Sequence, residues 1–225
     1  MLNDNLTATG IAIIEKYIGN PAQINKTQFE LDNIELPPNW QLLSIGQFCK
    51  ETKSGATPSR DISEYWNSGD IPWVKSGEVH NGIIIQVEEK ITQVAVENSS
   101  TKLLPADTVL MAMYGVTAGE VGYLAIPATT NQAVCGMVCN SKSEAAYLFF
   151  SLLQSKEQAS RLSNGGAQDN LSKGFIDNII LVVPTHPEIE ALHLNNIISS
   201  IFLNSQEILK LSGMQNNLLS QLSSH

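Results

Sequence analysis

The chain has 225 residues, 43% of them apolar, which is enough for one or two ordered domains with a proper core. No apolar run reaches the roughly 18 residues of a membrane span, and the first ten residues lack the basic start and apolar stretch of a signal peptide. We therefore expect no membrane contact and a cytoplasmic location. The formal net charge of −9 excludes a strongly basic clamp on nucleic acid that acts alone.

The N-terminal residues predict a helix. Ile11, Ile14 and Ile18 recur at helical spacing within residues 6–18, and the stop signal Gly-Asn-Pro follows them. The residues after this signal are typical of a linker. We interpret residues 1–35 as an N-terminal helix with its linker.

Residues 36–185 have the pattern of a mixed domain, of class α/β (α+β) with a mixed β-sheet. Short β-rich runs separated by turns lie at 71–74, 82–87, 108–113, 121–126, 132–139 and 179–183. One helix is predicted at 143–162, with Ser143 as its N-cap. The three cysteines are an odd number for a disulfide framework, and Cys135 and Cys139 have no nearby histidine, so we predict no metal site and interpret both as small buried hydrophobes.

The last unit, 186–225, predicts a long C-terminal helix of about 50 Å. Apolar residues recur along it with heptad spacing, which is typical of an antiparallel coiled-coil seam, and Asn204 and Gln215 interrupt the seam at positions suited to fixing register. The predicted dimerisation residues are Leu194, Ile197, Ile201, Ile208, Leu211, Leu218 and Leu222. The alternative is a helix that folds back on its own domain.

Catalytic motifs are sparse. The chain has no Walker loop and no G-x-G-x-x-G after a strand, and its four histidines suggest no triad. Asp70, Glu88 and Lys90 have the spacing of a Mg²⁺-dependent nuclease, with the last two on one face of a strand. Because this pattern is short and is also typical of a solvated strand end, a stand-alone nuclease is kept only as an alternative.

Residues 164–175, NGGAQDNLSKGF, form a second candidate. Their glycines expose backbone N–H groups, and Gln168, Asn170, Ser172 and Lys173 carry groups suited to base edges or phosphates. A helix C-cap followed by a turn into the last strand would explain the same residues.

Several segments follow one another in a specific order. LPPNWQLLSIGQFC (36–49) precedes SGATPSRDISEYWNSGDIPWVKSGEV (54–79), and then come 103–125, 129–138 and 147–192. The set resembles the specificity (S) subunits of type I restriction-modification enzymes, in which the first segment opens a target-recognition domain, the second is its hallmark, and the last enters a long helix. The resemblance covers about residues 36–222.

Two departures accompany the resemblance. The closing motif of the family commonly reads P-x-x-x-E-Q, and here Ile189 stands in place of the glutamine. Family members also usually carry two recognition domains and two helical regions, so this chain resembles a half-size S subunit, with residues 6–35 resembling the tail of a conserved helical region.

The resemblance implies a non-catalytic subunit that reads a half-site of double-stranded DNA and docks methyltransferase (M) subunits and, through them, a restriction (R) subunit. It implies no cofactor of its own, because S-adenosylmethionine, Mg and ATP would belong to the partner subunits. A homodimer formed through the C-terminal helix would read an inverted bipartite sequence. The alternative is a dimerising interaction module without sequence readout.

We expect the DNA-binding residues among polar and basic side chains in or near loops rich in Gly or Pro, with Arg60 as the preferred single residue. They are Lys53, Thr57, Ser59, Arg60, Lys75, Gln168, Asn170 and Lys173. Within 55–73 we interpret Tyr65, Trp66, Ile71, Pro72 and Trp73 as core and turn residues, so the segment shapes a loop and does not catalyse.

Overall fold

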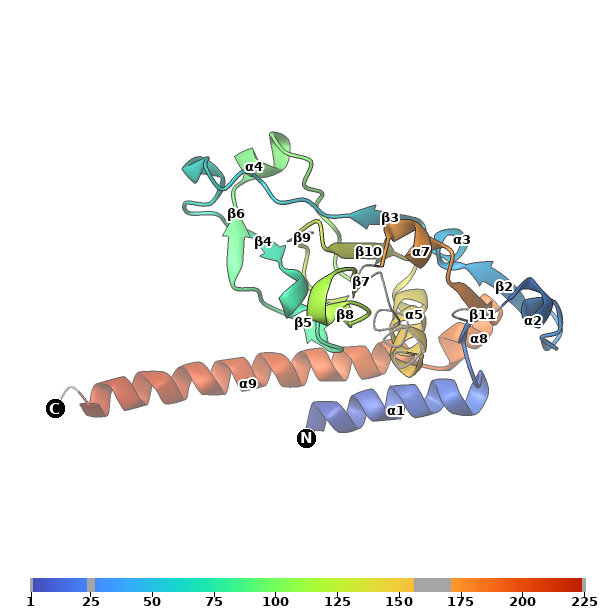
Figure 1. Cartoon of the computed structure of the whole chain (residues 1–225). Helices are drawn as coiled ribbons and strands as arrows, with labels where there is room; N and C mark the ends of the chain where they lie inside the picture. The colour runs from blue at the N-terminus through green and yellow to red at the C-terminus, as the bar shows by residue number, and fades with distance from the viewer. Residues whose placement is uncertain (1, 24–26, 156–170, 224–225) are drawn as a thin grey trace.

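The structure is a computed structural model that describes residues 2–23, 27–155 and 171–223 (Figure 1). Its helices are α1 (Leu2–Tyr17), α2 (Gln28–Asp32), α3 (Ile45–Phe48), α4 (Gln93–Glu97), α5 (Lys142–Gln154), α7 (Lys173–Asp177), α8 (His186–Ala191) and α9 (Leu194–Ser223). Short 3₁₀ turns are η1 (Ser63–Tyr65), η2 (Ser76–Glu78) and η3 (Gly115–Thr117). The strands are β1 (Ala22–Gln23), β2 (Gln41–Ser44), β3 (Glu51–Ser54), β4 (Ile71–Val74), β5 (Ile83–Ile84), β6 (Glu89–Ile91), β7 (Thr108–Ala112), β8 (Val121–Leu124), β9 (Thr129–Thr130), β10 (Val134–Val138) and β11 (Ile180–Val183).

The strands form three sheets. The largest has the order β3-β10-β7-β8-β5 and is antiparallel except for the β8–β5 pair. The order β1-β11-β2 makes an antiparallel sheet, and β6-β4-β9 makes a mixed one in which β4 and β9 are parallel. This arrangement confirms the predicted mixed α and β class, and each predicted β-rich run contains a strand.

The predicted linker after α1 holds more structure than the sequence indicated. Residues 22–23 form β1, which pairs with β11, and the short helix α2 follows. Strands β2, β3, β6 and β9 were also not predicted. β3 reads Glu-Thr-Lys-Ser and has no apolar residue, so only its pairing with β10 defines it.

Helix α5 forms the centre of the main core. All of its residues from Ala145 to Leu153 are buried, and it packs on β7 and β8. Ser141, not Ser143 as predicted, caps it, because the Ser141 hydroxyl accepts a hydrogen bond from the Glu144 N–H at 3.1 Å. The predicted end of this helix, at 156–162, lies outside the described residues.

The cysteines lie where β3 and β10 meet. Cys49 and Cys135 are buried, and Cys139 is half-buried with its Sγ atom 4.0 Å from that of Cys49. Burial raises the pKa of the Cys135 thiol to about 12, so it stays protonated at neutral pH. This matches the interpretation of small buried hydrophobes.

The sequence had suggested one continuous C-terminal helix. In the structure this helix is broken after α8. His193 has φ +52°, a left-handed conformation that α8 cannot continue through, and α9 starts at the next residue. The break lets both Ile189 and Leu194 enter the main core, where they are 3% and 1% exposed. The side chains on either side of the break thus both contribute to the core.

Helices α1 and α9 lie side by side and run in opposite directions (Figure 1). The Asn3 side chain accepts a hydrogen bond from Asn204 at 3.2 Å and donates one to Ser205 at 2.9 Å. Asn204 thus fixes the register of a helix pair within the chain.

Helix α1 also packs closely on α5. Gly10 permits this contact, because a Cβ at this position would collide with the Phe150 ring.

The two halves of α9 differ in burial. Leu194, Ile198 and Ile201 are buried in the chain's own core, and Ile197 is half-buried. From residue 206 to 223 every residue is exposed, and this segment of about 27 Å extends past the N-terminal end of α1 (Figure 1). The first half of the helix therefore folds back on its own domain, and the second half does not.

Candidate nucleic-acid interface

Two tryptophans of the hallmark segment hold the loop that carries Arg60. Trp73 on β4 is 3% exposed, and its ring meets that of Trp66 edge to face with centroids 5.1 Å apart. The Trp66 Nε1–H donates to the Ser59 carbonyl at 3.0 Å, and the Trp73 Nε1–H donates to the Ala56 carbonyl at 3.1 Å. The two indoles thereby fix both ends of the 56–59 loop.

Arg60 stacks on this aromatic pair. Its guanidinium carbon lies 3.5 Å from the centroid of the Trp66 ring and 5.1 Å from that of Trp73. Its Nη1 donates to Oε2 of Glu89 at 2.5 Å, yet 52% of the side chain is exposed. The cation–π contact and the ion pair together restrict Arg60 to one orientation at the surface.

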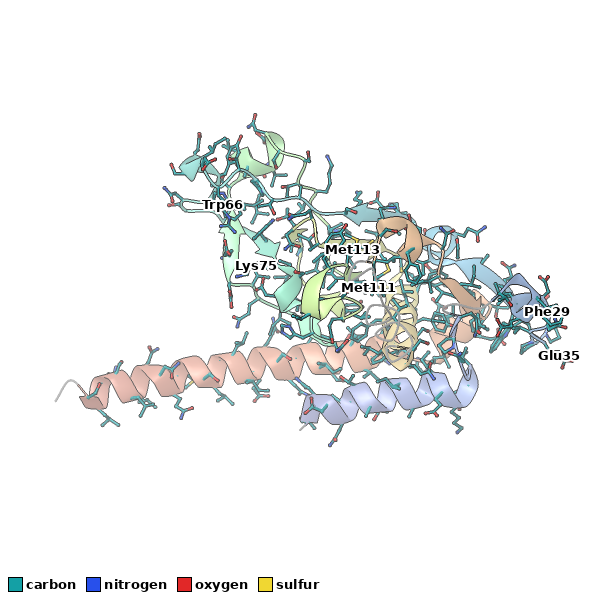
Figure 2. All side chains as sticks on the ribbon, viewed as in Figure 1. Phe29, Glu35, Trp66, Lys75, Met111 and Met113 are labelled. Carbon is teal, nitrogen blue, oxygen red and sulfur yellow. The ribbon has the colours of Figure 1, made fainter. Side chains whose placement is uncertain are left out.

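Lys75, which follows β4, joins the same cluster. Its Nζ lies 2.6 Å from Oε2 of Glu88 and 3.3 Å from Oε1 of Glu89. The hydrogen bond to Glu88 is the main cause that raises the pKa of Lys75, and the hydrogen bond from Arg60 is the main cause that lowers the pKa of Glu89. We call Arg60, Trp66, Lys75, Glu88 and Glu89 the Arg60 cluster; Figure 2 labels its Trp66 and Lys75.

Two further candidates belong to the loop of this cluster. The Thr57 hydroxyl donates to the Gln132 side chain, and the Ser59 hydroxyl accepts from the Asp61 N–H at 3.3 Å. The fold thus brings Thr57, Ser59, Arg60 and Lys75 to one region. Gln132, just before β10, is a polar neighbour that the sequence did not indicate.

Lys53 and Lys173 belong to a different region, around β3. Lys53 pairs with Glu51 at 2.7 Å, and Lys173 on α7 pairs with Asp177 at 2.5 Å. The Thr52 hydroxyl donates to the same Asp177 at 2.6 Å, which joins α7 to β3. Gln168 and Asn170 lie outside the described residues.

Each of the four described basic candidates therefore has a carboxylate partner. Exposed ion pairs of this kind contribute about 0–1 kcal/mol, so an incoming phosphate or base edge can replace the carboxylate at small cost. A carboxylate that stays paired with its Lys or Arg also repels a nearby phosphate. The paired carboxylates leave little net positive charge at these positions, in agreement with the net charge of −9.

Glu89 is the residue that sequence reasoning missed. Strand pairing sets it opposite Trp73, next to Arg60, although the sequence alternative had selected its neighbour Glu88. A local pattern could not have identified Glu89, because Arg60 is 29 positions away in the chain.

The nuclease set does not assemble. Antiparallel pairing puts Ile71 opposite Ile91 and Trp73 opposite Glu89, so Asp70 and Glu88 flank opposite ends of the strand pair. Four extended residues separate these ends, about 13 Å, which is too far for two carboxylates to share one metal ion. In the described part of the chain, no group of three or more His, Cys, Asp or Glu residues could hold a metal ion.

The composition of the helices bears on whether the chain could cross a membrane. Among the described residues, no helix combines the length and apolar character that crossing a bilayer requires.

The sequence matches a known family over most of its length. The profile of the type I restriction modification DNA specificity domain matches residues 37–217. The specificity subunit of type I restriction enzyme MjaIX of Methanocaldococcus jannaschii is 30% identical over 172 residues, which cover 72% of this chain and 38% of that protein. The specificity subunit of type I restriction enzyme HindI of Haemophilus influenzae is 26% identical, over 83% of this chain and 41% of that protein.

Solved structures agree on the fold. An S subunit of a type I restriction-modification system from M. genitalium has a TM-score of 0.61 at 14% identity, covering 97% of this chain and 52% of that one. The HsdS subunit from Thermoanaerobacter tengcongensis has a TM-score of 0.59 at 12% identity, covering 91% of this chain and 46% of that one. The chain thus spans about half or less of the length of these proteins. With the profile matching residues 37–217, it belongs to the family of type I restriction-modification specificity subunits.

Proposed function

We propose that this chain reads one half-site of a bipartite DNA sequence, with Arg60 as the main base-reading residue. The observation that carries the proposal is the guanidinium fixed 3.5 Å above the Trp66 ring while half of the side chain stays exposed. A guanidinium held in one orientation suits the paired acceptors of guanine in the major groove. Thr57, Ser59 and Lys75 border it, and Lys53 and Lys173 are proposed to contact phosphates.

The acidic members of the cluster support recognition by base sequence over recognition by charge. Glu88 and Glu89 hold Arg60 and Lys75 when no DNA is bound. DNA must replace these pairs, and because each contributes only about 0–1 kcal/mol, the preference for one base sequence would come from how well its acceptors fit the fixed guanidinium. Other subunits of the complex would supply much of the remaining phosphate contact.

The free half of α9 is proposed to pair with the same segment of a second copy. Its apolar residues at heptad positions are exposed: Ile208 by 56%, Leu211 by 57%, Leu218 by 59% and Leu222 by 76%. These positions are nearly symmetric about Gln215. An antiparallel pair with its two-fold axis at Gln215 would therefore set Ile208 against Leu222 and Leu211 against Leu218 of the second copy.

Such a pair would lead to an inverted recognition site. The two recognition domains would lie at opposite ends of a two-helix spacer, related by the two-fold axis, and would read two copies of one half-site in opposite directions. Because Leu194 and Ile201 are already buried within the chain, the proposed dimer seam is limited to the four exposed positions beyond them.

Docking of M subunits, and of an R subunit through them, rests on family membership. The relatives are named as specificity subunits of type I restriction enzymes, and one similar solved chain comes from a study of complex assembly in a type I system. In such a complex, S-adenosylmethionine, Mg²⁺ and ATP would be bound by the partner subunits.

The test is co-expression of the chain with a type I M subunit that co-purifies with it, followed by mapping of methylated adenines in the host DNA. We expect a new inverted bipartite motif. Arg60→Ala should abolish or relax it without loss of the complex, and Lys142→Ala should leave it unchanged, since Lys142 forms a comparable exposed pair with Asp107 at 3.2 Å. A complex that forms and gives no motif would favour an interaction module without sequence readout.

A further inference from the structure

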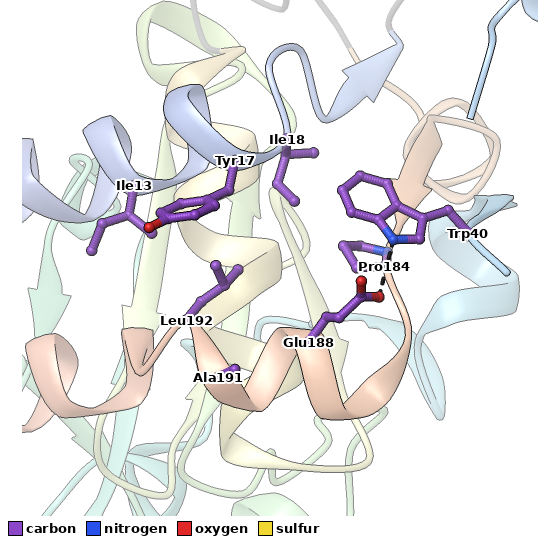
Figure 3. A pocket seen from close by; sticks show the side chains of 8 residues that line it. All are labelled: Ile13, Tyr17, Ile18, Trp40, Pro184, Glu188, Ala191 and Leu192. Atoms are coloured by element: carbon purple, nitrogen blue, oxygen red, sulfur yellow. Dashed lines mark hydrogen bonds between the residues drawn. The ribbon is translucent and has the colours of Figure 1, made fainter. Parts of the chain in front are cut away.

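A groove lies where α1, the residues before β2 and α8 meet. It has two adjoining hollows of about 410 and about 340 Å³, and Tyr17, Ile18 and Trp40 line both. Figure 3 shows the larger hollow, with Tyr17 and Leu192 on one side and Trp40 and Glu188 on the other. Glu35 lines the smaller hollow and lies at the opposite end of the molecule from Trp66 and Lys75 (Figure 2). The groove is therefore distinct from the Arg60 cluster.

The walls of the groove suit a long, flat cationic side chain. Tyr17 is 59% exposed, and Trp40 is half-buried. The Lys16 ammonium already lies 5.2 Å from the centroid of the Tyr17 ring, so this ring attracts a cation within the chain itself. Ile13, Ile18 and Leu192 are half-buried and provide apolar surface for the methylene groups of a side chain.

Two carboxylates line the groove, and the Lys16 ammonium over the Tyr17 ring lies beside it. The Glu188 carboxylate accepts hydrogen bonds from the Trp40 Nε1–H at 3.0 Å, from the Thr185 N–H at 2.9 Å and from the Thr185 hydroxyl at 2.6 Å. All three reach Oε2, and within the described residues Oε1 receives none. Glu35 adds a second carboxylate, and no Lys or Arg is among the described residues that line either hollow.

We propose that this groove binds an arginine side chain presented by another protein subunit. The guanidinium would displace the Lys16 ammonium from the Tyr17 ring, lie between Tyr17 and Trp40, and donate to Oε1 of Glu188, a charge-assisted bond that leaves the three bonds to Oε2 in place. Nucleic acid does not fit, because both carboxylates repel phosphate. The inference goes beyond DNA reading, which does not require this surface.

The test uses the full chain labelled with 5-fluorotryptophan. Its three tryptophans give three ¹⁹F resonances, and Trp40→Phe identifies that of Trp40. The probes are N-acetyl-arginine methylamide and its uncharged analogue N-acetyl-citrulline methylamide. We expect saturable shifts of the Trp40 resonance, with a Kd for the arginine probe about tenfold lower than for the citrulline probe, equivalent to about 1.4 kcal/mol.

Two variants separate the groove from general effects. Glu188→Gln retains an acceptor for Trp40 and Thr185 and should remove the preference for arginine, whereas Glu190→Gln, two positions away, should retain it. Tyr17→Ala changes an exposed ring and should weaken arginine binding. Equal responses to both probes, a preference that survives in Glu188→Gln, or shifts confined to Trp66 and Trp73 would overturn the proposal. So would a Trp40 resonance that shifts on dilution without probe, because a second copy would then occupy the groove.

Discussion

The indole of Trp40 donates a hydrogen bond of 3.0 Å to the carboxylate of Glu188, across 148 positions of sequence. Trp40 lies just before β2 and Glu188 lies in α8, directly after β11, the strand that pairs with β2. The bond therefore joins the beginning and the end of the mixed α and β part of the chain. It also gives a structural reason for the glutamate of the closing motif, which serves Trp40 and the start of α8 together.

Ile189 departs from the family's usual glutamine for a visible reason. Its side chain is 3% exposed and belongs to the main core, together with Leu194 after the break at His193. A glutamine there would place an amide among apolar side chains. Ile189 suits the way α8 packs in this chain.

Glu188 should make the stability of the protein depend on pH. Its hydrogen bonds lower its pKa below the ordinary value of 4.5, so the charged form is favoured in the folded state. The resulting stabilisation is fully present above the pKa that Glu188 has in the unfolded chain. It is lost as the pH falls through the lower pKa that Glu188 has in the folded protein. In urea unfolding, the stability difference between the wild type and Glu188→Gln should shrink below about pH 4.5. Glu190→Gln is the control, and a difference that is constant with pH would contradict the assignment.

Gly55 should be essential for the loop of the Arg60 cluster. A Cβ at this position would collide with the backbone carbonyl oxygens of Thr130 and Asn131, which cannot move without disturbing β9. Gly55→Ala should therefore cost about 1–3 kcal/mol of unfolding free energy. Gly77→Ala is the matched control, because its Cβ would meet nothing within 4 Å. Equal urea midpoints for the two variants would show that the loop has room to shift.

Glu89 should limit binding to DNA of unrelated sequence. In Glu89→Gln, Arg60 loses its carboxylate partner and becomes available to phosphates, whereas Lys75 keeps its ion pair with Glu88. The slope of log K against log salt should steepen by about 1 for each additional phosphate that the protein neutralises. Fluorescence anisotropy of a random duplex with the M-containing complex measures this slope. Glu97→Gln removes the same charge from α4, and a slope that changes equally in both variants would leave Glu89 no special role.

The exposed half of α9 should control dimerisation. Ile208→Asp puts a charge in the proposed seam and should give a monomer by light scattering. Leu209→Asp is the control, since Leu209 is 38% exposed and faces away from the seam. Ile201→Asp is a poor test of the same idea, because Ile201 is 4% exposed and its substitution would disrupt the chain's own core. A dimer mass retained in Ile208→Asp would exclude this helix pairing.

Many elements of the fold could be predicted from the local pattern of apolar and turn residues. Val109, Leu110 and Met111 on β7, like Cys135 and Met137 on β10, lie in short apolar runs bounded by turn residues, a pattern that favours strands. The heptad spacing beyond residue 194 predicted the long helix in the same way. The polar strand β3 and the short strands β1 and β9 carry no such pattern, because pairing with distant strands defines them.

By itself, the sequence determined the mixed class of the fold, the family and the loop segment of Arg60, since these depend on residue types and on their order along the chain. Tertiary structure alone decided which carboxylates meet Arg60 and Lys75, that Asp70 and Glu88 stay apart, and that α9 divides into a buried and an exposed half. Each of these depends on strand register or on packing between residues far apart in the chain, and periodicity along the chain carries no information about either. The bond between Trp40 and Glu188 is of the same kind: both residues stand in recognisable motifs, but only the pairing of β2 with β11 brings them together.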